Sequence, residues 1–415
     1  MSDAKCLIVT THYKPLVGGA QAVYDALADK APGNFGVLTG KRDFVRRNEV
    51  SSWQAFDESA KYPITRIERL RPDMLGDKPN IASRLSSHFS ARKIRHEVLD
   101  AVVKSYKEGG YNIVCIGALD ALGWLVEALQ EALGIKVILY THGEEISQTA
   151  YNERAEKARE RYLSQADGVI AVSSFTSALI EKKYGVPKDK IKCLGNGVNL
   201  EKFRARPTEN VRVPLGLSAG PLVLSVGRLV ERKGFDQLLR AWPNVLTVVP
   251  EAQLAIVGSG PQEDELVAII DELGISKSVQ LLGHVSDGQL PSLYASADVF
   301  AMPNRTLPDG DTEGFGLVFL EAAAAGTPSI AGRAGGAVDA VLDGKTGLLV
   351  DGTDIGAISF AVTEFLTNEV RCGEMADAAR AHALTQGWED KASELIAYMN
   401  GLLDGVEHNA DEGTP

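Results

Sequence analysis

The chain has 415 residues, and 45% of them are apolar, which is enough to bury two separate hydrophobic cores. No segment reaches the run of about 18 apolar residues that a membrane-spanning helix needs, and the first residues lack the apolar core of a signal peptide. The four cysteines are scattered and form no C-x-x-C pair, so free thiols in a reducing compartment are expected. The composition predicts a cytoplasmic protein, at most peripheral at the inner face of a membrane.

The net charge of −12 is distributed unevenly along the chain. Residues 1–205 contain 30 Lys and Arg against 25 Asp and Glu, whereas the remainder contains 13 against 30. The acidic second half is not expected to bind nucleic acid or anionic membranes. The mildly basic first half is the part that could meet an anionic surface.

Strand-like and helix-like segments alternate along the first half, as is typical of parallel α/β folds. Strands are expected at residues 5–10, 35–38, 64–70, 113–117, 137–141, 169–172 and 191–194. Helical patterns occur at 19–31, 91–107, 121–133 and 153–165. The Pro-containing segment 201–217 is weakly periodic, which indicates an interdomain linker.

The second half repeats the alternation. Its strands are expected at residues 222–227, 254–257, 279–282, 299–302, 329–331 and 347–350. Two doubly wound α/β domains facing each other across a cleft are therefore predicted, because ligands in such sheets bind beyond the carboxyl ends of the strands. The predicted parts are an N-terminal domain of residues 1–205, a C-terminal domain of residues 206–387, a last helix at 388–403 and a polar tail at 404–415.

An acidic, glycine-containing segment, DTEGFGLVFLE, ends at Glu321 and opens an apolar helix. The amides of Gly316, Leu317 and Val318 at the helix start can seat an anion such as a diphosphate. Glu313 lies in the turn beside them, and Glu321 lies about two helical turns further on. Carboxylates on both sides of a phosphate seat suit a nucleotide-sugar, with hydroxyls at either end. The alternative is a pair of solvated helix charges, although the apolar neighbours of Glu321 disfavour it.

This Glu-x7-Glu pattern, with Gly335-Gly336 and the sequence GKTGLLV further on, resembles retaining glycosyltransferases of family 4, which have the GT-B fold. The resemblance covers essentially the whole chain, and it implies two Rossmann-like domains. It also implies transfer of a hexosyl group from a nucleoside diphosphate sugar to a glycolipid or saccharide acceptor held by the N-terminal domain. Phosphatidylinositol-mannoside mannosyltransferases are the most similar in these motifs, which favours GDP-mannose over UDP-sugars and mannose over glucose or N-acetylglucosamine.

Cations follow the first strand of the second half in the sequence GRLVERKG, where Arg228 and Lys233 can reach a diphosphate. Ordinary surface charge is the alternative. The family resemblance implies that both residues hold the donor diphosphate and neutralise it as it leaves; Arg232 is ranked below them. It also implies that Glu313 contacts sugar hydroxyls and that Glu321 holds the ribose. We expect the variants Lys233→Ala and Glu313→Ala to lose turnover while keeping their fold.

Two motifs of the first half follow predicted strands. Gly18 and Gly19 begin a helix and can bring backbone amides close to phosphate or acceptor, although a plain tight turn explains them as well. His142 ends an apolar strand, so it is either a structural histidine or, as the resemblance implies, a contact to the donor sugar or its phosphate. It is not assigned as a general base, because the leaving phosphate itself helps to remove the acceptor proton in such enzymes.

The remaining candidates rest mainly on the resemblance. Gly258 and Val285, each after a strand, would lie near the nucleotide, and Phe315 lies in the phosphate-seat turn; a lone Gly-x-Gly is weak evidence by itself. The pair Asp309 and Asp311 looks like a metal-binding D-x-D, but the cations and the helix dipole take that role in GT-B enzymes. Neither a metal nor another cofactor is expected.

A basic stretch, SRLSSHFSARKIRHE, places Arg84, His88, Arg92 and Arg95 on one helical face. It is either a solvated face or a contact to anionic lipid head groups or an acceptor phosphate. Two other functions stay open at this stage. One is another GT-B enzyme, such as a nucleotide-sugar epimerase or a phosphorylase, and the other is a non-catalytic nucleotide-sugar-binding protein.

Overall fold

The computed structural model describes residues 3–72, 81–204 and 211–405, and within residues 81–90 it describes the backbone alone. The chain divides into two compact units, and each is described by itself. Unit 1 comprises Met1–Val172, Thr176–Leu194 and Trp388–Pro415, and unit 2 comprises Ser173–Phe175 and Gly195–Gly387. The units therefore divide earlier in the chain than the predicted boundary after residue 205. The acceptor-binding and donor-binding roles of the two parts stay predictions.

Unit 1 is built on a seven-stranded parallel sheet with strand order β5-β2-β1-β6-β7-β8-β9 among the described residues. The strands are β1 (Cys6–Val9), β2 (Phe35–Gly40), β5 (Ile64–Ile67), β6 (Ile113–Ile116), β7 (Lys136–Thr141), β8 (Gly168–Ala171) and β9 (Ile191–Cys193). Every residue of β1 and β6 is buried, as expected for central parallel strands covered on both faces. The strand order reverses between β1 and β6, so the loops after these two strands mark the ligand-binding edge of the sheet.

Helices cover both faces of this sheet, and a small hairpin is appended to it. The helices are α1 (Gly19–Lys30), α2 (Trp53–Ser59), α3 (Ile81–Gly109), α4 (Leu119–Leu122), α5 (Leu125–Leu133), α6 (Glu144–Ser147), α7 (Glu153–Gln165) and α8 (Ser174–Tyr184), with a 3-10 turn η1 (Lys188–Lys190); the hairpin strands are β3 (Arg42–Asp43) and β4 (Asn48–Glu49). Helix α3 extends the predicted segment 91–107 in both directions.

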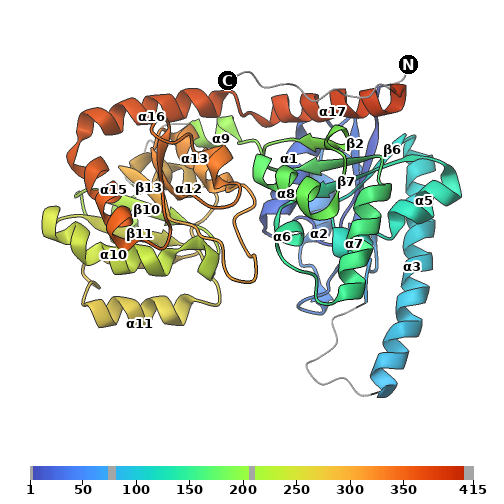
Figure 1. Ribbon diagram of the computed structural model, residues 1–415, viewed down its shortest axis with the longest axis horizontal. Helices are drawn as coiled ribbons and strands as arrows, with labels where there is room; N and C mark the ends of the chain where they lie inside the picture. Colours follow the sequence, from blue (N-terminus) through green and yellow to red (C-terminus); the bar gives the residue numbers. More distant parts are fainter. Residues whose placement is uncertain (1–2, 73–80, 205–210, 406–415) are drawn as a thin grey trace. The chain divides into compact units, whose positions relative to one another are not determined.

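The last helix, α17 (Trp388–Asp404), belongs to unit 1 although it follows all of unit 2 in the sequence (Figure 1). Lys30 of α1 forms an ion pair with Glu389 at 2.6 Å, and the amide of Ala4 donates to Asn400 Oδ1 at 2.8 Å. A Cβ on Gly168 of β8 would lie 2.1 Å from the hydroxyl oxygen of Tyr398. This close packing fixes the helix on the first unit.

Unit 2 has a six-stranded parallel sheet, in the order β12-β11-β10-β13-β14-β15 among the described residues. The strands are β10 (Leu222–Val226), β11 (Gln253–Val257), β12 (Val279–Gly283), β13 (Val299–Met302), β14 (Ser329–Gly332) and β15 (Gly347–Val350). The helices are α9 (Leu200–Arg204), α10 (Phe235–Val248), α11 (Glu263–Leu273), α12 (Leu290–Ser296), α13 (Leu317–Ala325), α14 (Ala337–Ala340), α15 (Ile355–Thr367) and α16 (Glu369–Leu384), with 3-10 turns η2 (Val213–Leu215) and η3 (Glu231–Lys233).

Large aromatic side chains fill the core of unit 2. Phe300 of β13 packs edge-on against Phe319 of α13, with ring centroids 5.6 Å apart, and both are fully buried. Phe203 of α9 packs edge-on against Tyr294 at 5.7 Å. The start of the predicted linker is therefore part of the unit 2 core, because one buried aromatic anchors an otherwise weakly periodic segment.

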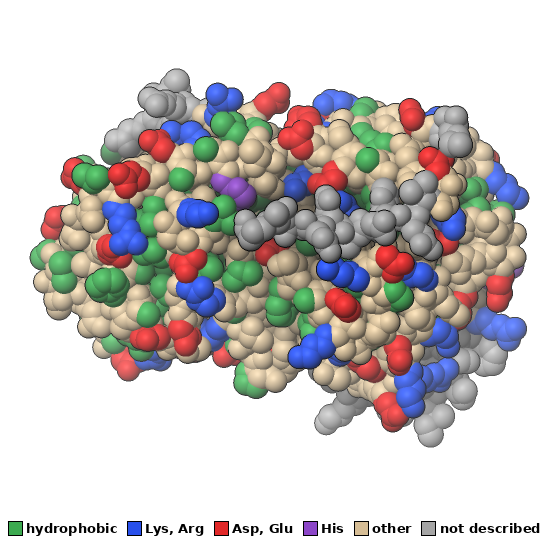
Figure 2. Space-filling view, turned by 45° about the horizontal axis from the view of Figure 1, so that its top comes forward, with side chains coloured by type: hydrophobic (Ala, Val, Ile, Leu, Met, Phe, Trp, Pro, Cys, Tyr) green, Lys and Arg blue, Asp and Glu red, His purple; other side chains and the backbone are tan. Residues whose placement is uncertain are grey.

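The predicted class, parallel α/β with two such domains, is confirmed, and every predicted strand segment overlaps a strand of the two sheets. No helix in the described part of the chain is both long and apolar enough to span a membrane. On the face shown in Figure 2, acidic and basic side chains are interspersed and hydrophobic ones are scattered among them.

Candidate active site

The switch point of the unit 2 sheet lies between β10 and β13, where the strand order reverses. The loop after β10 contains residues 227–234, and the loop after β13 contains residues 303–316. Because parallel strands end at the same edge, these two loops come together. They carry most of the candidate residues that the sequence predicted in this unit.

Lys233 and Glu313 form a buried ion pair at this point. The Lys233 Nζ lies 2.5 Å from Glu313 Oε2, and the two residues are only 8% and 7% exposed. Burial alone would raise the pKa of Glu313, but the charges of Lys233 and Arg232 and a hydrogen bond from the Phe315 amide outweigh burial and lower it. Glu313 is therefore held as a carboxylate, and a cation is held beside it.

Two glycines hold the backbone of Glu313 in place from the loop after β14. The amide of Gly336 donates to the carbonyl of Glu313 at 2.7 Å. A Cβ on Gly336 would lie 1.9 Å from the carbonyl oxygen of Gly314, and one on Gly335, whose φ is +60°, would lie 2.1 Å from that of Glu313. Only glycine allows the two backbones to come this close.

Helix α13 begins at the same place, with Gly316 as its N-cap at φ +88°. The amides of Gly316, Leu317 and Val318 donate no hydrogen bond to any residue that the structure describes. Such amides, with the positive end of the helix dipole, attract an anion. The buried ring of Phe315 precedes them.

Glu321 lies further along α13, where Tyr294 OH donates to its Oε2 at 2.9 Å. Burial raises the pKa of Glu321, while the Tyr294 hydroxyl and the positive charges of Lys202 and Lys233 act in the opposite direction. The carboxylate is thus oriented by a buried phenol. Tyr294 gave no signal in the sequence, because it lies inside an ordinary helical pattern.

The other predicted residues of unit 2 lie in the turns that follow its strands. Arg228 is exposed one residue beyond Gly227, and Val285 is buried two residues beyond the end of β12. Gly258 has φ +135°, and a Cβ there would lie 1.9 Å from the carbonyl oxygen of Gly227. The turns after β10 and β11 therefore touch, which places Gly258 beside the Arg228 loop.

Asp311 faces a cation rather than a second carboxylate. Arg232 Nε lies 3.4 Å from Asp311 Oδ1 and donates to the Thr312 carbonyl at 3.2 Å. Among the described residues, no cluster of three or more His, Cys, Asp or Glu side chains could hold a metal ion. The sequence missed Arg305, which pairs with Asp236 through two contacts of 2.8 and 3.0 Å and ties the β13 loop to the start of α10.

In unit 1, His142 follows β7 and meets Tyr24 of α1. The His142 Nε2 lies 2.6 Å from the Tyr24 hydroxyl oxygen, and the His142 amide donates to Glu145 Oε1 at 2.7 Å. Burial lowers the pKa of His142 to about 4 and raises the pKa of Glu145 to about 7. The imidazole is therefore neutral at neutral pH. The sequence indicated His142 but not its two partners. Tyr24 is distant in the chain, and Glu145 lies in the short helix α6, which has no pattern of its own.

The opposite pKa shifts of His142 and Glu145 predict a pH effect that one substitution should reveal. The depressed pKa of His142 makes the protein lose stability as the pH falls from about 6.5 to about 4, because the unfolded chain then binds the extra proton. The raised pKa of Glu145 has the opposite effect between about pH 4.5 and 7, so the two slopes nearly cancel. In Glu145→Gln, unfolding free energy should fall by about 3 kcal/mol more than in the wild type between pH 6.5 and 4.

Urea unfolding at several pH values measures this difference. Glu144→Gln is the matched control, since the neighbouring Glu144 is exposed, and its curve should run parallel to that of the wild type. Parallel curves for Glu145→Gln as well would mean that the two groups do not titrate as their burial requires.

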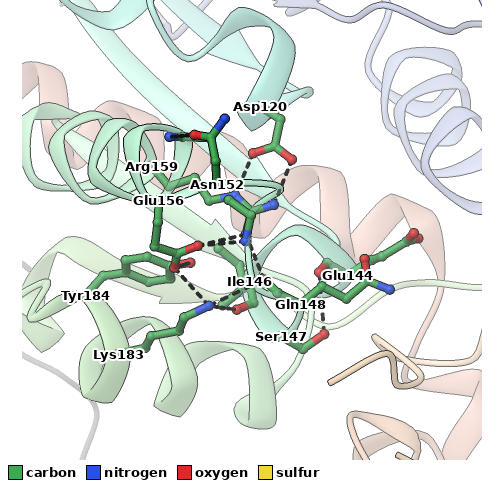
Figure 3. A network of polar contacts seen from close by, with 12 residues as sticks. Asp120, Glu144, Ile146, Ser147, Gln148, Asn152, Glu156, Arg159, Lys183 and Tyr184 are labelled. Carbon is green, nitrogen blue, oxygen red and sulfur yellow. Dashed lines mark hydrogen bonds and ion pairs between the residues drawn. The ribbon is translucent and has the colours of Figure 1, made fainter. Parts of the chain in front are cut away.

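A polar network holds the segment that follows His142 (Figure 3). The guanidinium of Arg159, buried in α7, pairs with Asp120 at 2.6 Å and donates to the Gln148 carbonyl at 2.7 Å. Glu156 accepts from the Ala150 amide at 2.7 Å, and Lys183 of α8 pairs with Glu156 at 3.0 Å. Helices α7 and α8 thereby fix the chain on the carboxyl side of His142.

The glycine pair lies at the start of α1. Gly18 is its N-cap, and its carbonyl accepts from the Ala22 amide at 3.0 Å. A Cβ on Gly18 would lie 2.2 Å from Gln21 Oε1, whereas one on Gly19 would meet nothing within 4 Å. These two residues lie in the loop after β1, at the switch point of the unit 1 sheet.

The basic stretch forms part of α3. Arg92 and Arg95 are exposed, and the Arg95 guanidinium lies 5.2 Å from the ring centroid of Trp124. The side chains of Arg84 and His88 lie outside the described residues. A membrane contact of this helix stays a prediction.

Two parallel α/β units, one of them with a helix start beside a buried cation and carboxylate at its switch point, form the arrangement expected of a glycosyltransferase with the GT-B fold. Residues 56–202 match the family described as "Glycosyltransferase Family 4", and residues 208–382 match "Glycosyl transferases group 1". The chain belongs to glycosyltransferase family 4, as its similarity to full-length relatives also shows. The predicted hexosyltransferase is thereby confirmed.

The relatives include proteins that are named for a glycosyl transfer activity. The chain is 33% identical over 406 residues to a GDP-mannose-dependent alpha-(1-6)-phosphatidylinositol monomannoside mannosyltransferase of Mycolicibacterium smegmatis, covering 95% of this chain and 98% of that one. It is 35% identical over 267 residues to a D-inositol 3-phosphate glycosyltransferase of Corynebacterium urealyticum, covering 62% of each.

Solved structures share the fold. The crystal structure of Anabaena HepE in complex with UDP and glucose superposes with a TM-score of 0.76 at 21% identity, covering 96% of this chain and all of that one. Sucrose-phosphate synthase from Thermosynechococcus elongatus gives a TM-score of 0.73 at 22% identity, covering 97% and 100%. These likenesses support the GT-B fold of the chain.

Proposed function

We propose that this enzyme transfers a mannosyl group from GDP-mannose to a phosphatidylinositol-mannoside-type glycolipid, with retention of the anomeric configuration. The observation that carries the proposal is the buried Lys233–Glu313 pair beside the first amides of α13, which donate to no residue that the structure describes. Relatives that are similar over nearly their full length are named GDP-mannose-dependent phosphatidylinositol monomannoside mannosyltransferases, which favours this donor and acceptor over UDP-sugars and free saccharides.

In this proposal, unit 2 binds the donor. The amides of Gly316–Val318 and the cations Arg228 and Lys233 hold the diphosphate, Glu313 accepts hydrogen bonds from mannose hydroxyls, and Glu321 accepts them from the ribose. Phe315, Gly258 and Val285 border the nucleotide. Glu313 already holds the Lys233 side chain in place. The donor phosphate therefore meets a fixed cation, and the side chains of the site need to move little when the donor binds.

In this proposal, unit 1 holds the acceptor, and its Gly18-Gly19 loop and His142 contribute ligand contacts. The bond between the anomeric carbon and the diphosphate oxygen breaks, and the acceptor oxygen bonds to the same face of that carbon. The acceptor proton passes to the leaving phosphate, and Lys233 and the α13 amides stabilise the negative charge on GDP. No metal ion takes part in this scheme. Contact of Arg84, Arg92 and Arg95 with anionic lipid would bring the enzyme to its acceptor, which vesicle sedimentation can test.

The proposal predicts a donor preference. Purified enzyme should release GDP from GDP-mannose in the presence of phosphatidylinositol-mannoside vesicles, and it should turn over UDP-glucose and UDP-N-acetylglucosamine at least tenfold more slowly. Transfer should persist in EDTA. The new linkage should be α by proton NMR, since the donor sugar is α-linked.

The same assay separates the rival functions. An epimerase would change the sugar nucleotide without acceptor, and a binding protein would release no nucleotide at all. Faster turnover of a UDP-sugar would refute the donor assignment, and a β-linked product would refute retention.

A further inference from the structure

The side chain of Arg305, in the loop after β13, is only 11% exposed, and its guanidinium pairs with two carboxylates. It contacts both oxygens of Asp236, at 2.8 and 3.0 Å, and it lies 3.3 Å from Oε1 of Glu231. Asp236 is a buried residue in the first turn of α10, and Glu231 begins the 3-10 turn η3. The planar fork of an arginine suits such a two-point contact, which a lysine cannot form. The guanidinium is therefore directed at the two elements that follow β10.

The main chain of the same loop supports η3 as well. The amide of Arg305 donates to the carbonyl of Arg232 at 2.8 Å. At the end of the turn, Gly234 has φ +74°, and a Cβ there would lie 2.1 Å from the carbonyl oxygen of Pro303. The turn thus rests on the loop after β13 at both positions that flank Lys233.

Lys233 needs this support because its own turn is short. The turn η3 has three residues, and the hydrogen bonds of 3-10 turns have poor geometry. Lysine also has a flexible stem, so a shift of the turn would move Nζ away from Glu313 Oε2, which it meets at 2.5 Å. The carbonyl of Glu313, in contrast, is held separately by the Gly336 amide. Losing the Arg305 contacts would therefore displace one partner of the ion pair and leave the other in place.

We propose that Arg305 is a positioning residue that holds the η3 turn, so that Lys233 stays opposite Glu313 and can bind the donor diphosphate. The inference rests on the proposed function for the identity of that ligand. It differs from a direct contact between Arg305 and the diphosphate, because the carboxylates of Asp236 and Glu231 already occupy the guanidinium. The two roles predict different results when Arg305 and Lys233 are changed together.

The affinity for GDP, measured by calorimetry on the full chain, distinguishes these roles. Arg305→Met should weaken GDP binding roughly tenfold, as expected when one charge-assisted contact is misplaced, and Lys233→Met should weaken it at least as much. The two losses should not add, because Arg305 acts through Lys233. The double variant should therefore bind GDP as Lys233→Met does. A further tenfold loss in the double variant would show that Arg305 binds the diphosphate itself, and it would overturn the proposal, as would wild-type affinity in Arg305→Met.

Two more variants test whether Arg305 acts through Asp236. Arg305→Lys keeps the charge but not the two-point contact, so its GDP affinity should lie between those of Arg305→Met and the wild type. Asp236→Asn should lose as much affinity as Arg305→Met, and combining the two should cost nothing further. Wild-type affinity in Asp236→Asn would refute this mechanism. Arg305→Met should still fold, because Gln237 donates to Asp236 at 3.0 Å and the start of α10 favours a carboxylate.

Urea unfolding tests the same coupling without a ligand. In the wild type, Lys233→Met should lower the urea midpoint, because it leaves the Glu313 carboxylate buried without its partner. In the Arg305→Met background Lys233 is already displaced, so the same substitution should lower the midpoint by a clearly smaller amount. Equal decreases in the two backgrounds would refute the positioning role. If the wild type did not bind GDP, the proposed donor would be wrong, and the unfolding experiment would still decide the role of Arg305.

Arg240→Met is the matched control. Arg240 lies on the same helix as Asp236 and forms an ion pair with Glu272 at 4.0 Å, but both side chains of that pair are exposed. Its loss should leave the GDP affinity and the unfolding comparison as in the wild type. An equal loss of affinity in Arg240→Met would show that removing any arginine at α10 has this effect, and it would refute the specific role of Arg305.

Discussion

Replacing Lys233 with methionine should abolish sugar transfer and also destabilise unit 2. A preorganised cation at a leaving group contributes several kcal/mol to transition-state stabilisation, so we expect turnover to fall about a thousandfold or more. The same change leaves the carboxylate of Glu313 buried without its partner at 2.5 Å. Breaking a buried pair on one side costs about 3–5 kcal/mol. Steady-state kinetics and thermal unfolding measure the two effects separately.

A double variant separates the two roles of the pair. Lys233→Met with Glu313→Gln removes both charges, so it should recover most of the lost stability while remaining inactive. Lys277→Met is the matched control, because Lys277 is an exposed lysine of the same unit, and it should behave like the wild type. If Lys233→Met alone were as stable as the wild type, water would have to replace Lys233 as the partner of the Glu313 carboxylate. An active double variant would remove Lys233 from the chemistry.

This result would revise an expectation from the sequence, namely that Lys233→Ala and Glu313→Ala keep their fold. The sequence indicated each residue separately, from its neighbours in a loop. It could not show that they touch, because they are 80 positions apart and meet only when β10 and β13 become neighbours. The order of the strands depends on how all the helices pack, so it cannot be predicted from the local periodicity of the sequence.

The fold itself was largely predictable, because buried parallel strands are short apolar runs and each such run became a strand. The two-residue strands β3 and β4 and the short helix α6 were missed, since segments of this length have no period to detect. Phe203 shows a further limit: a single buried aromatic ties the start of the segment whose pattern indicated a linker to the core of unit 2, whose main part begins earlier, at Gly195. Tyr24 was invisible for a similar reason. Its hydroxyl meets His142, 118 positions away, only in the folded chain.

Replacing Gly336 with alanine should destabilise unit 2 and impair transfer, although this residue is assigned no contact with the donor. The new Cβ would lie 1.9 Å from the carbonyl oxygen of Gly314. That neighbour is backbone and cannot rotate away, so the turn carrying Glu313 must move. Overpacking of this kind costs about 1–3 kcal/mol, and a displacement of about 1 Å at a reacting site can reduce turnover a hundredfold.

Gly373→Ala provides the contrast, because a Cβ there meets nothing within 4 Å and the residue lies in the exposed interior of α16. Alanine should stabilise that helix by up to about 1 kcal/mol. The two glycine substitutions are thus expected to shift the melting temperature in opposite directions, and only Gly336→Ala should lower kcat. If Gly336→Ala had the melting temperature and kcat of the wild type, the turn that carries Glu313 would tolerate movement. Its close contact with the loop after β14 would then not be what sets the position of the carboxylate.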